Sequence, residues 1–254
     1  SESQFKQGEA LFRLGKFQEA HQSYRAVVEK FKGEFEDEAS LGMGRCLFQM
    51  GKKAEAGESF LKTAKKYPDT KTAPIALFNG GSSLFAVGEY QRALATFDEL
   101  LKAKIDENLM TNSQYWRGQC LLKLGRNDDA LKQLSSMRQD SVKFDQAKIL
   151  HGLAEGHFAA GQYLEAAGSY QTLVKEYPGH ELADAAAYSL CLSLEKLGKI
   201  DDGKKKAAEF LAAYKESPHA GAVRFLLAEF HHRSGEFDKA IPLYKQVYDA
   251  SGEL

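Results

Sequence analysis

Residues 8–24 read GEALFRLGKFQEAHQSY, and the pattern of this stretch returns along the whole chain. At its centre lies Leu14-Gly15-Lys16-Phe17, and a glycine in a similar context occurs six more times. The seven loop glycines are spaced 36 or 37 residues apart: Gly15, Gly51, Gly88, Gly125, Gly161, Gly198 and Gly235. A constant period of this length indicates a repeat architecture, so local segments are interpreted in the register of the repeat.

Small side chains occupy two further positions of every repeat. Seven residues before the loop glycine stand Gly8, Gly44, Gly81, Gly118, Ala154, Cys191 and Ala228. Five residues after it stand Ala20, Ala56, Ala93, Ala130, Ala166, Gly203 and Ala240. Small residues at fixed positions allow two helices to cross closely, so both positions are predicted to lie on packed helix faces.

A large apolar side chain follows the loop glycine by nine residues in six of the seven repeats. These residues are Tyr24, Phe60, Phe97, Leu134, Tyr170 and Tyr244, whereas the sixth repeat has Ala207. A glycine that ends one apolar-periodic segment is typical of the left-handed residue that stops a helix. Because a second apolar period begins about three residues later, each repeat is predicted to be a helical hairpin. Pro68 and Pro178 are expected to end second helices, and Asn79-Gly80-Gly81 falls inside a first helix by register.

These residues resemble the tetratricopeptide repeat, through Gly8, Leu14, Gly15, Phe17, Ala20 and Tyr24 and their counterparts over residues 1–250. The period is longer than the usual ~34 residues, and Gln4, Ser40 or Gln114 replaces the large aromatic expected early in the first helix. The resemblance implies an all-α fold, a right-handed α-solenoid of about seven helical hairpins, as one superhelix over residues 1–254. The expected repeats are approximately 1–36, 37–73, 74–110, 111–146, 147–183, 184–220 and 221–254.

The longer period and the segments between repeats are similar to those of a bacterial subgroup of this family. Examples of such segments are Tyr67-Pro68-Asp69-Thr70 and Ser217-Pro218-His219-Ala220. The subgroup is typified by the Tol–Pal-associated cell-division coordinator and the lipoprotein of outer-membrane barrel assembly. This resemblance implies a periplasmic or cell-envelope-associated adaptor, with a cytoplasmic location as the alternative. The sequence holds neither the lipid-carrying cysteine nor the coiled-coil segment of those proteins, and Ser1–Gln4 show no export pattern, although a mature chain has already lost its signal.

The charge balance excludes several classes of partner. The 34 Lys and Arg residues nearly cancel the 35 Asp and Glu residues, so no overall field attracts nucleic acid or an anionic membrane. No apolar run reaches the ~18–20 residues that span a bilayer. Cys46, Cys120 and Cys191 lie 74 and 71 residues apart, which fits no zinc or redox spacing, so we expect them to be small packing residues.

Aromatic residues dominate two columns on one stripe of the predicted first helices. Ten residues before the loop glycine stand Phe5, Leu41, Phe78, Tyr115, His151, Tyr188 and Phe225. Three residues before it stand Phe12, Phe48, Phe85, Leu122, Phe158, Glu195 and His232. Between the columns, six residues before the glycine, runs a mostly polar row of Glu9, Arg45, Ser82, Gln119, Glu155, Leu192 and Glu229. In the family that the chain resembles, the corresponding residues line the concave groove.

We therefore expect a groove that binds a protein or an extended or helical peptide, since buried rings supply most interface energy and polar residues fix the register. The candidate binding residues are Phe5, Phe12, Arg45, Phe48, Phe78, Phe85, Tyr115, Trp116, Gln119, Phe158 and Tyr188. Tyr115 and Trp116, with Gln119, are the expected anchor in the middle repeat. An aromatic residue at helical spacing is more often core than ligand site, so the alternative is that Trp116 fills a gap between hairpins.

The sequence offers no pattern for catalysis or for a metal. His151 and Glu155 share a helix face, but His157 lies six residues further on and points away. No nucleophile elbow or phosphate-binding glycine loop occurs, so we expect no enzymatic activity, no metal and no cofactor. The alternative to a binding scaffold is a structural subunit that associates with itself, because terminal repeats normally need a polar cap and the seventh repeat stops at Leu254 without one.

Overall fold

The computed structural model describes residues 1–31, 33–140 and 144–251, and the regular structure in this part of the chain is α-helical. The chain divides into two compact units, unit 1 at Ser1–Arg126 and unit 2 at Asn127–Leu254. Unit 1 contains α1 (Glu2–Arg13), α2 (Phe17–Lys30), α3 (Glu36–Gln49), α4 (Lys53–Lys66), α5 (Thr72–Ala86), α6 (Tyr90–Leu100) and α7 (Glu107–Lys123). Unit 2 contains α8 (Asn127–Asp140), α9 (Gln146–Ala159), α10 (Tyr163–Glu176), α11 (Ala183–Lys196), α12 (Ile200–Ala213), α13 (Ala220–Arg233) and α14 (Phe237–Ser251).

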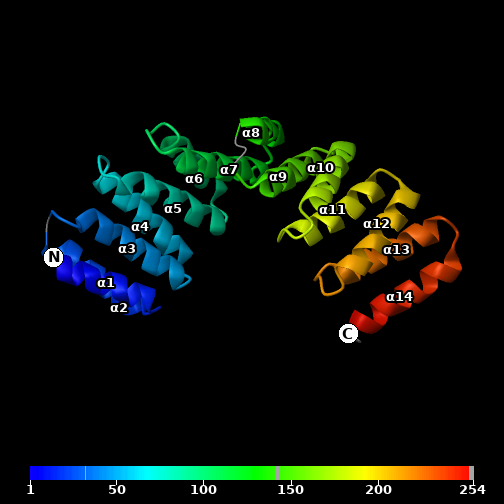
Figure 1. Cartoon of the computed structure of the whole chain (residues 1–254), viewed down its shortest axis with the longest axis horizontal. Coiled ribbons are helices and arrows are strands. Elements are labelled where there is room, and N and C mark those ends of the chain that lie inside the picture. The colour runs from blue at the N-terminus through cyan, green and yellow to red at the C-terminus, as the bar shows by residue number, and fades with distance from the viewer. Residues whose placement is uncertain (32, 141–143, 252–254) are drawn as a thin grey trace. The chain divides into compact units, whose positions relative to one another are not determined.

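Within each unit every helix packs against the next one along the chain, which confirms the predicted α-solenoid (Figure 1). The odd-numbered helices are the predicted first helices of the hairpins, and the even-numbered ones are the second helices. That all the hairpins continue one superhelix stays a prediction. Residues 141–143 and 252–254, near the ends of the fourth and seventh expected repeats, lie outside the described residues.

The loop glycines end the first helices as the sequence predicts. All seven have a positive φ, between 67° and 83°, which is the left-handed region that glycine enters without steric cost. At the first of them, the Gly15 amide donates to the Phe12 carbonyl and the Lys16 amide donates to the Leu11 carbonyl, at 3.0 and 2.9 Å. These bonds satisfy carbonyls that the end of α1 would otherwise leave without a partner.

The other local predictions about helix ends are also confirmed. Helix α4 ends at Lys66 and α10 ends at Glu176, in each case two residues before the proline that was expected to stop it. Asn79-Gly80-Gly81 lies inside α5, although the same tripeptide would favour a turn in isolation. The packing of α5 against α4 and α6 therefore outweighs the low helix propensity of the two glycines.

The small side chains before the loop glycines make room for the large rings after them. A Cβ atom on Gly44 would lie 2.6 Å from the ring of Phe60, and one on Gly81 would lie 2.9 Å from the ring of Phe97. Both rings are buried, and each comes from the second helix of the same hairpin as its glycine. The predicted close helix crossing is therefore confirmed as an interlock between a small residue and a ring.

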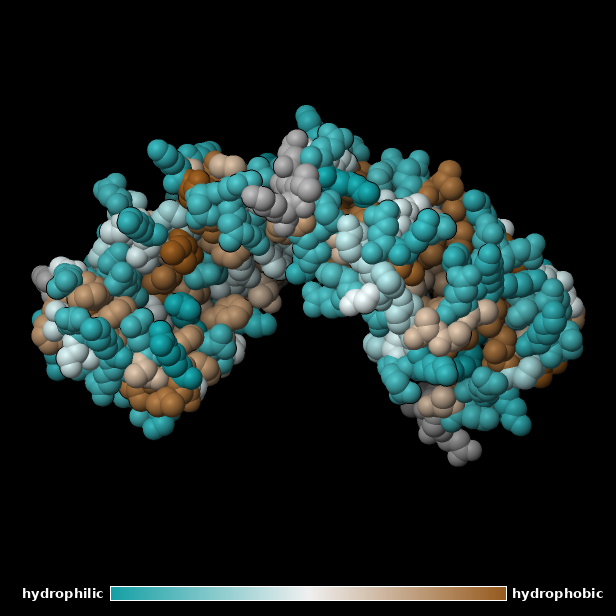
Figure 2. Space-filling view, viewed as in Figure 1, coloured by the Kyte–Doolittle hydropathy of each residue, from teal (hydrophilic) through white to brown (hydrophobic). Residues whose placement is uncertain are grey.

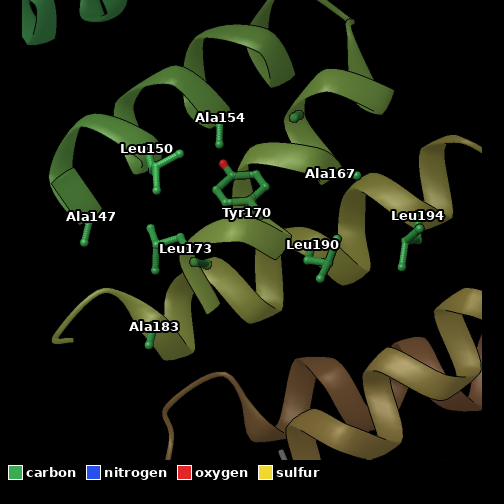
Figure 3. Close-up of a cluster of buried hydrophobic side chains, with 11 residues drawn as sticks. Ala147, Leu150, Ala154, Ala167, Tyr170, Leu173, Ala183, Leu190 and Leu194 are labelled. Carbon is green, nitrogen blue, oxygen red and sulfur yellow. The ribbon is translucent and has the colours of Figure 1, made fainter. Parts of the chain in front are cut away.

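The same interlock operates in unit 2, where Tyr170 of α10 lies beside Ala154 of α9 in a buried cluster (Figure 3). The three cysteines also behave as predicted, since all are unpaired and fully buried. Burial raises the pKa of the Cys46 thiol to about 11 and those of Cys120 and Cys191 to about 12. A thiol with such a pKa is unreactive at neutral pH, which fits a packing role.

The sixth hairpin shows how the exception at Ala207 is compensated. Phe230 of α13 is fully buried and packs in one cluster with Ala207 and Cys191. A Cβ atom on Gly203 would lie only 2.5 Å from Cζ of Phe230. The ring that the sixth repeat lacks is therefore supplied by the following hairpin, and Gly203 stands where the other repeats have alanine because that ring comes so close.

A cluster of charged side chains joins α12 to the loop between α13 and α14. Glu236 accepts a hydrogen bond from Nζ of Lys204 at 2.9 Å, and its other oxygen lies 2.5 Å from Nδ1 of His231 and 3.3 Å from Nζ of Lys239. These hydrogen bonds lower the pKa of Glu236 from 4.5 to about 2, and the bond from Lys204 has the largest effect. The carboxylate therefore stabilises the packing of the last two hairpins as long as it is charged.

Replacing Glu236 with glutamine should reduce stability in a pH-dependent way. A carboxyl whose pKa is depressed by folding contributes stability above its unfolded value of 4.5, and this contribution is lost as the pH falls towards about 2. Thermal unfolding of wild type and Glu236→Gln at several pH values measures this. The wild type should melt higher at pH 7, and the two curves should converge near pH 2. A melting difference that does not change with pH would contradict the role of the charge.

Candidate functional site

Unit 1 carries a pocket of about 260 Å³ between its first three hairpins. The pocket brings together four of the candidate binding residues, and its lining includes Phe12, Arg45, Phe48, Phe78, Asn79 and Ser82. These side chains come from α1, α3 and α5, the first helices of consecutive hairpins. On the face shown in Figure 2, apolar patches lie among hydrophilic side chains over this part of unit 1.

The repeat explains why these side chains meet. Phe12 and Phe48 stand three residues before their loop glycines, so stacking two hairpins places them in the same column. Phe78 belongs to the other aromatic column and lies one hairpin further on, with its ring 6.0 Å from that of Phe97. The buried ring of Phe60, which fills the interlock with Gly44, also lines the pocket. The pocket is thus formed by residues that the core already holds in place.

Arg45 is the charged residue of the pocket lining. Its guanidinium carbon lies 5.3 Å from the centroid of the Phe12 ring, within the range of a cation–π interaction. Phe12 in turn meets Phe17 edge to face at 5.3 Å, so its orientation is fixed by α2. The Phe48 side chain remains 37% exposed, which leaves a large apolar group accessible beside the cation.

Four neutral polar side chains also line the pocket: Gln49, Asn79, Ser82 and Ser83. The hydroxyl of Ser83 donates to the carbonyl of Asn79 at 2.7 Å and is thereby satisfied. The Ser82 hydroxyl is buried and has no hydrogen-bond partner among the described residues. A buried hydroxyl without a hydrogen-bond partner destabilises the protein. A group that enters the pocket and bonds to the Ser82 hydroxyl would remove this cost.

A second group of candidate residues lies where α5 meets α7. The ring of Phe85 packs edge to face against Trp116 at 5.0 Å, and Trp116 meets Tyr115 at 5.7 Å. Gln119 is buried, and its Nε2 has no hydrogen-bond partner among the described residues. The alternative interpretation is that Trp116 fills a gap between hairpins. The contact between Trp116 and Phe85 agrees with that interpretation. That this group also binds a partner stays a prediction.

The remaining three candidates do not line the pocket. Phe5 stacks on Phe35 with ring centroids 5.0 Å apart, and Phe35 holds a φ of 67°, a conformation that aromatic residues rarely adopt. Phe158 packs on Tyr163 at 5.2 Å. Tyr188 stacks on His219 at 4.7 Å, and both this residue and Phe158 belong to unit 2.

Asn79, which was not among the predicted binding residues, lines the pocket next to Phe78. The sequence held a signal for it, because Asn79 stands nine residues before its loop glycine, the position that Trp116 occupies one repeat later. The equivalence of these two positions therefore predicts that Asn79 faces the groove if Trp116 does. Ser82, a member of the predicted polar row, also lines the pocket.

Two of the histidines that the sequence analysis considered for a metal pair with neighbouring side chains. Nδ1 of His151 lies 3.3 Å from a carboxylate oxygen of Glu155, and Nδ1 of His157 lies 2.7 Å from the amide oxygen of Gln162. Over residues 1–31, 33–140 and 144–251, no three His, Cys, Asp or Glu side chains gather as a metal site would require. Within the same ranges, none of the helices has both the length and the apolar character needed to cross a bilayer.

Comparisons with known proteins agree on the repeat. A tetratricopeptide repeat family model matches residues 5–70, 78–141 and 188–253, and a second tetratricopeptide repeat model matches residues 150–180. The TPR repeat-containing protein YpiA of Bacillus subtilis is 28% identical over 167 residues, which are 65% of this chain and 36% of YpiA. The chain therefore spans little more than a third of that relative.

Solved structures share the fold. A tetratricopeptide repeat protein from Parabacteroides merdae superimposes with a TM-score of 0.70 at 18% identity, over 99% of this chain and 93% of the other. MamA from Desulfovibrio magneticus RS-1 gives a TM-score of 0.58 at 21% identity, over 72% of this chain and 95% of its own. At these identities the likeness shows the arrangement of helices alone.

Proposed function

Because the chain belongs to the tetratricopeptide repeat family, whose members generally serve as scaffolds for protein–protein interactions, we propose that it is a non-enzymatic scaffold that binds a protein or peptide. The observation that carries the proposal is the pocket of unit 1, which gathers Phe12, Phe48 and Phe78 from three consecutive first helices. Rings held by a rigid core and still accessible are the groups that supply most binding energy at interfaces.

The dimensions of the pocket favour a polypeptide over a free small molecule. At about 260 Å³ it is smaller than the ~300–1,000 Å³ typical of pockets that enclose a ligand. Exposed side chains such as Phe48 and Arg45 stand at its rim. One side chain of an extended or helical partner can therefore enter, while the partner backbone continues along the first helices.

The cellular role of the scaffold is the finer part of the proposal. The period of 36–37 residues and the segments between repeats resemble those of bacterial envelope proteins, which supports an adaptor in a multiprotein complex of the cell envelope. A periplasmic location follows from that role, and the cytoplasm is the alternative.

Replacing Phe48 with alanine should weaken partner binding about tenfold, because an accessible ring at the centre of an interface typically contributes more than 1 kcal/mol. The partner is first isolated from native extract with the wild-type chain, and its Kd is then measured with purified proteins by calorimetry. Phe48 is a better choice than Trp116, since Trp116 packs on Phe85 and its removal would disturb unit 1.

Leu14→Ala is the matched control, because Leu14 is 72% exposed, is apolar and does not line the pocket. It should bind like the wild type. Equal affinities for the wild type and Phe48→Ala would show that the partner binds elsewhere.

Self-association is the second candidate function, and the last helix supports it. Phe237 and Ile241 of α14 are more than half exposed and stand four residues apart on one helix face. An exposed apolar face of this kind can pack against a second copy of the chain. Sedimentation at high protein concentration separates the two functions, since a chain that stays monomeric does not assemble through α14.

A further inference from the structure

We propose that the pocket of unit 1 selects a peptide in which a glutamate or aspartate side chain stands beside a leucine-sized apolar side chain. This inference rests on the proposed function and adds the chemistry of the partner. It is based on the charge of Arg45, the buried hydroxyl of Ser82 and the rings that surround them.

Arg45 is a cation without a counterion. No carboxylate of the described residues lies within ion-pair distance of its guanidinium group, although Glu9 occupies the same position of the preceding repeat. Two exposed arginines of unit 1 are paired by contrast, since Arg25 bonds to Glu29 at 2.6 Å and Arg92 bonds to Glu58 at 2.7 Å. The donors of Arg45 are therefore free for an anionic group.

The cation is also held in place. The Phe12 ring supports the guanidinium at 5.3 Å, and Phe12 is itself fixed by its edge contact with Phe17. A planar guanidinium that is already oriented loses less entropy when it binds a carboxylate. This arrangement favours a ligand oxygen over bulk water as the partner of the cation.

The rest of the lining adds donors and no negative charge. The polar residues that line the pocket with Arg45 are the amides Gln49 and Asn79 and the hydroxyls Ser82 and Ser83, so the lining carries a charge of +1. The Ser82 hydroxyl lacks a partner among the described residues and can donate to a carboxylate oxygen. Phe48 and Phe78 offer the apolar surface for the neighbouring side chain.

The charge and the exposure of the pocket favour one kind of anionic group, the carboxylate of an internal acidic side chain. A phosphate group carries close to two charges at neutral pH and is usually recognised by a cluster of arginines, whereas this pocket has one. Arg45 and Phe48 are both exposed at the rim, so a bound chain can continue in both directions. An internal acidic side chain, rather than a chain terminus, fits such a site.

The test is a selection from a display library of random dodecapeptides, fused at both ends so that none has a free terminal carboxylate. The purified full-length chain is used as wild type, as Arg45→Gln and as Arg25→Gln. Arg25 is the matched control, because it is an exposed arginine on α2 outside the pocket. Circular dichroism of each variant verifies that the helices are intact.

Peptides selected by the wild type and by Arg25→Gln should be enriched in Glu or Asp next to Leu, Ile, Met or Phe. This enrichment should disappear with Arg45→Gln. For the best wild-type peptide, changing its acidic residue to the amide should weaken binding about tenfold, as loss of a charge-assisted hydrogen bond implies. The same change should have no effect on binding to Arg45→Gln.

Other results would overturn the inference in distinguishable ways. Selected peptides without an acidic preference, or with a preference that survives Arg45→Gln, would refute acidic selectivity and leave groove binding in place. Tighter binding when phosphoserine replaces the acidic residue would show that the pocket is a phosphate site. Failure of every version of the chain to select any peptide would refute both the inference and the proposed function.

Discussion

Replacing Phe97 with alanine should lower the free energy of unfolding of unit 1 by about 3–5 kcal/mol, the usual cost of removing a large ring from a packed core. Phe97 is fully buried, lies against Gly81 and meets Phe78 at 6.0 Å. Because Gly81 has no side chain with which to fill the space, the cavity cannot close easily. Urea titration followed by far-UV circular dichroism measures the change.

Phe48→Ala is the control for this experiment, since it removes the same ring from a site that is 37% exposed. It should cost about 1–2 kcal/mol, clearly less than Phe97→Ala, because part of the ring is already in contact with solvent and its removal leaves no closed cavity. Similar losses for Phe97→Ala and Phe48→Ala would contradict the interlock between Gly81 and Phe97.

Gly203→Ala should destabilise unit 2 by about 2 kcal/mol, although alanine is the better helix former and occupies this position in the other six repeats. The new Cβ would lie 2.5 to 2.8 Å from three atoms of the Phe230 ring. That ring is fully buried, so it can move only by displacing the cluster around Ala207. Thermal and urea unfolding of the variant measure the loss.

Gly168→Ala is the matched control, because Gly168 lies inside α10 and a Cβ there would meet no atom within 4 Å. The same substitution should therefore stabilise this helix by about 0.5–1 kcal/mol. Phe230→Leu should reduce the cost of Gly203→Ala, since the smaller side chain leaves room for the methyl group. Stabilisation by Gly203→Ala would show that Phe230 does not occupy the place described here.

The fold could be predicted from the sequence because every hairpin places the same types of residue at the same positions. Gly15 and its counterparts mark the loop within each hairpin, and the pairing of Gly44 with Phe60 or Gly81 with Phe97 is visible as two fixed positions of the repeat. Even the departure at Ala207 is visible in the sequence. The compensation of Ala207 by Phe230 could not be predicted from the sequence. The Phe230 ring comes from the following hairpin and stands at a position where no other repeat has an aromatic residue.

The candidate site was only partly predictable. Phe12, Phe48 and Phe78 meet because their positions are set by the repeat. Phe5 and Tyr188 belong to the same column, but their neighbours Phe35 and His219 come from the segments between hairpins, whose conformation does not follow the period. The lack of a counterion at Arg45 could not be foreseen either, since it depends on the reach of individual side chains such as that of Glu9.

The interlock between a small residue and a ring within one hairpin also bears on how such a gene can change. The ring and the small residue that it packs against are encoded within about 20 codons of each other. An in-frame duplication of 37 codons would therefore copy a complete hairpin together with this packing pair. Gly203 and Phe230 lie on different hairpins, so a hairpin inserted between the sixth and the seventh would separate this small residue from its ring. The sixth and seventh hairpins should therefore be inherited as a pair.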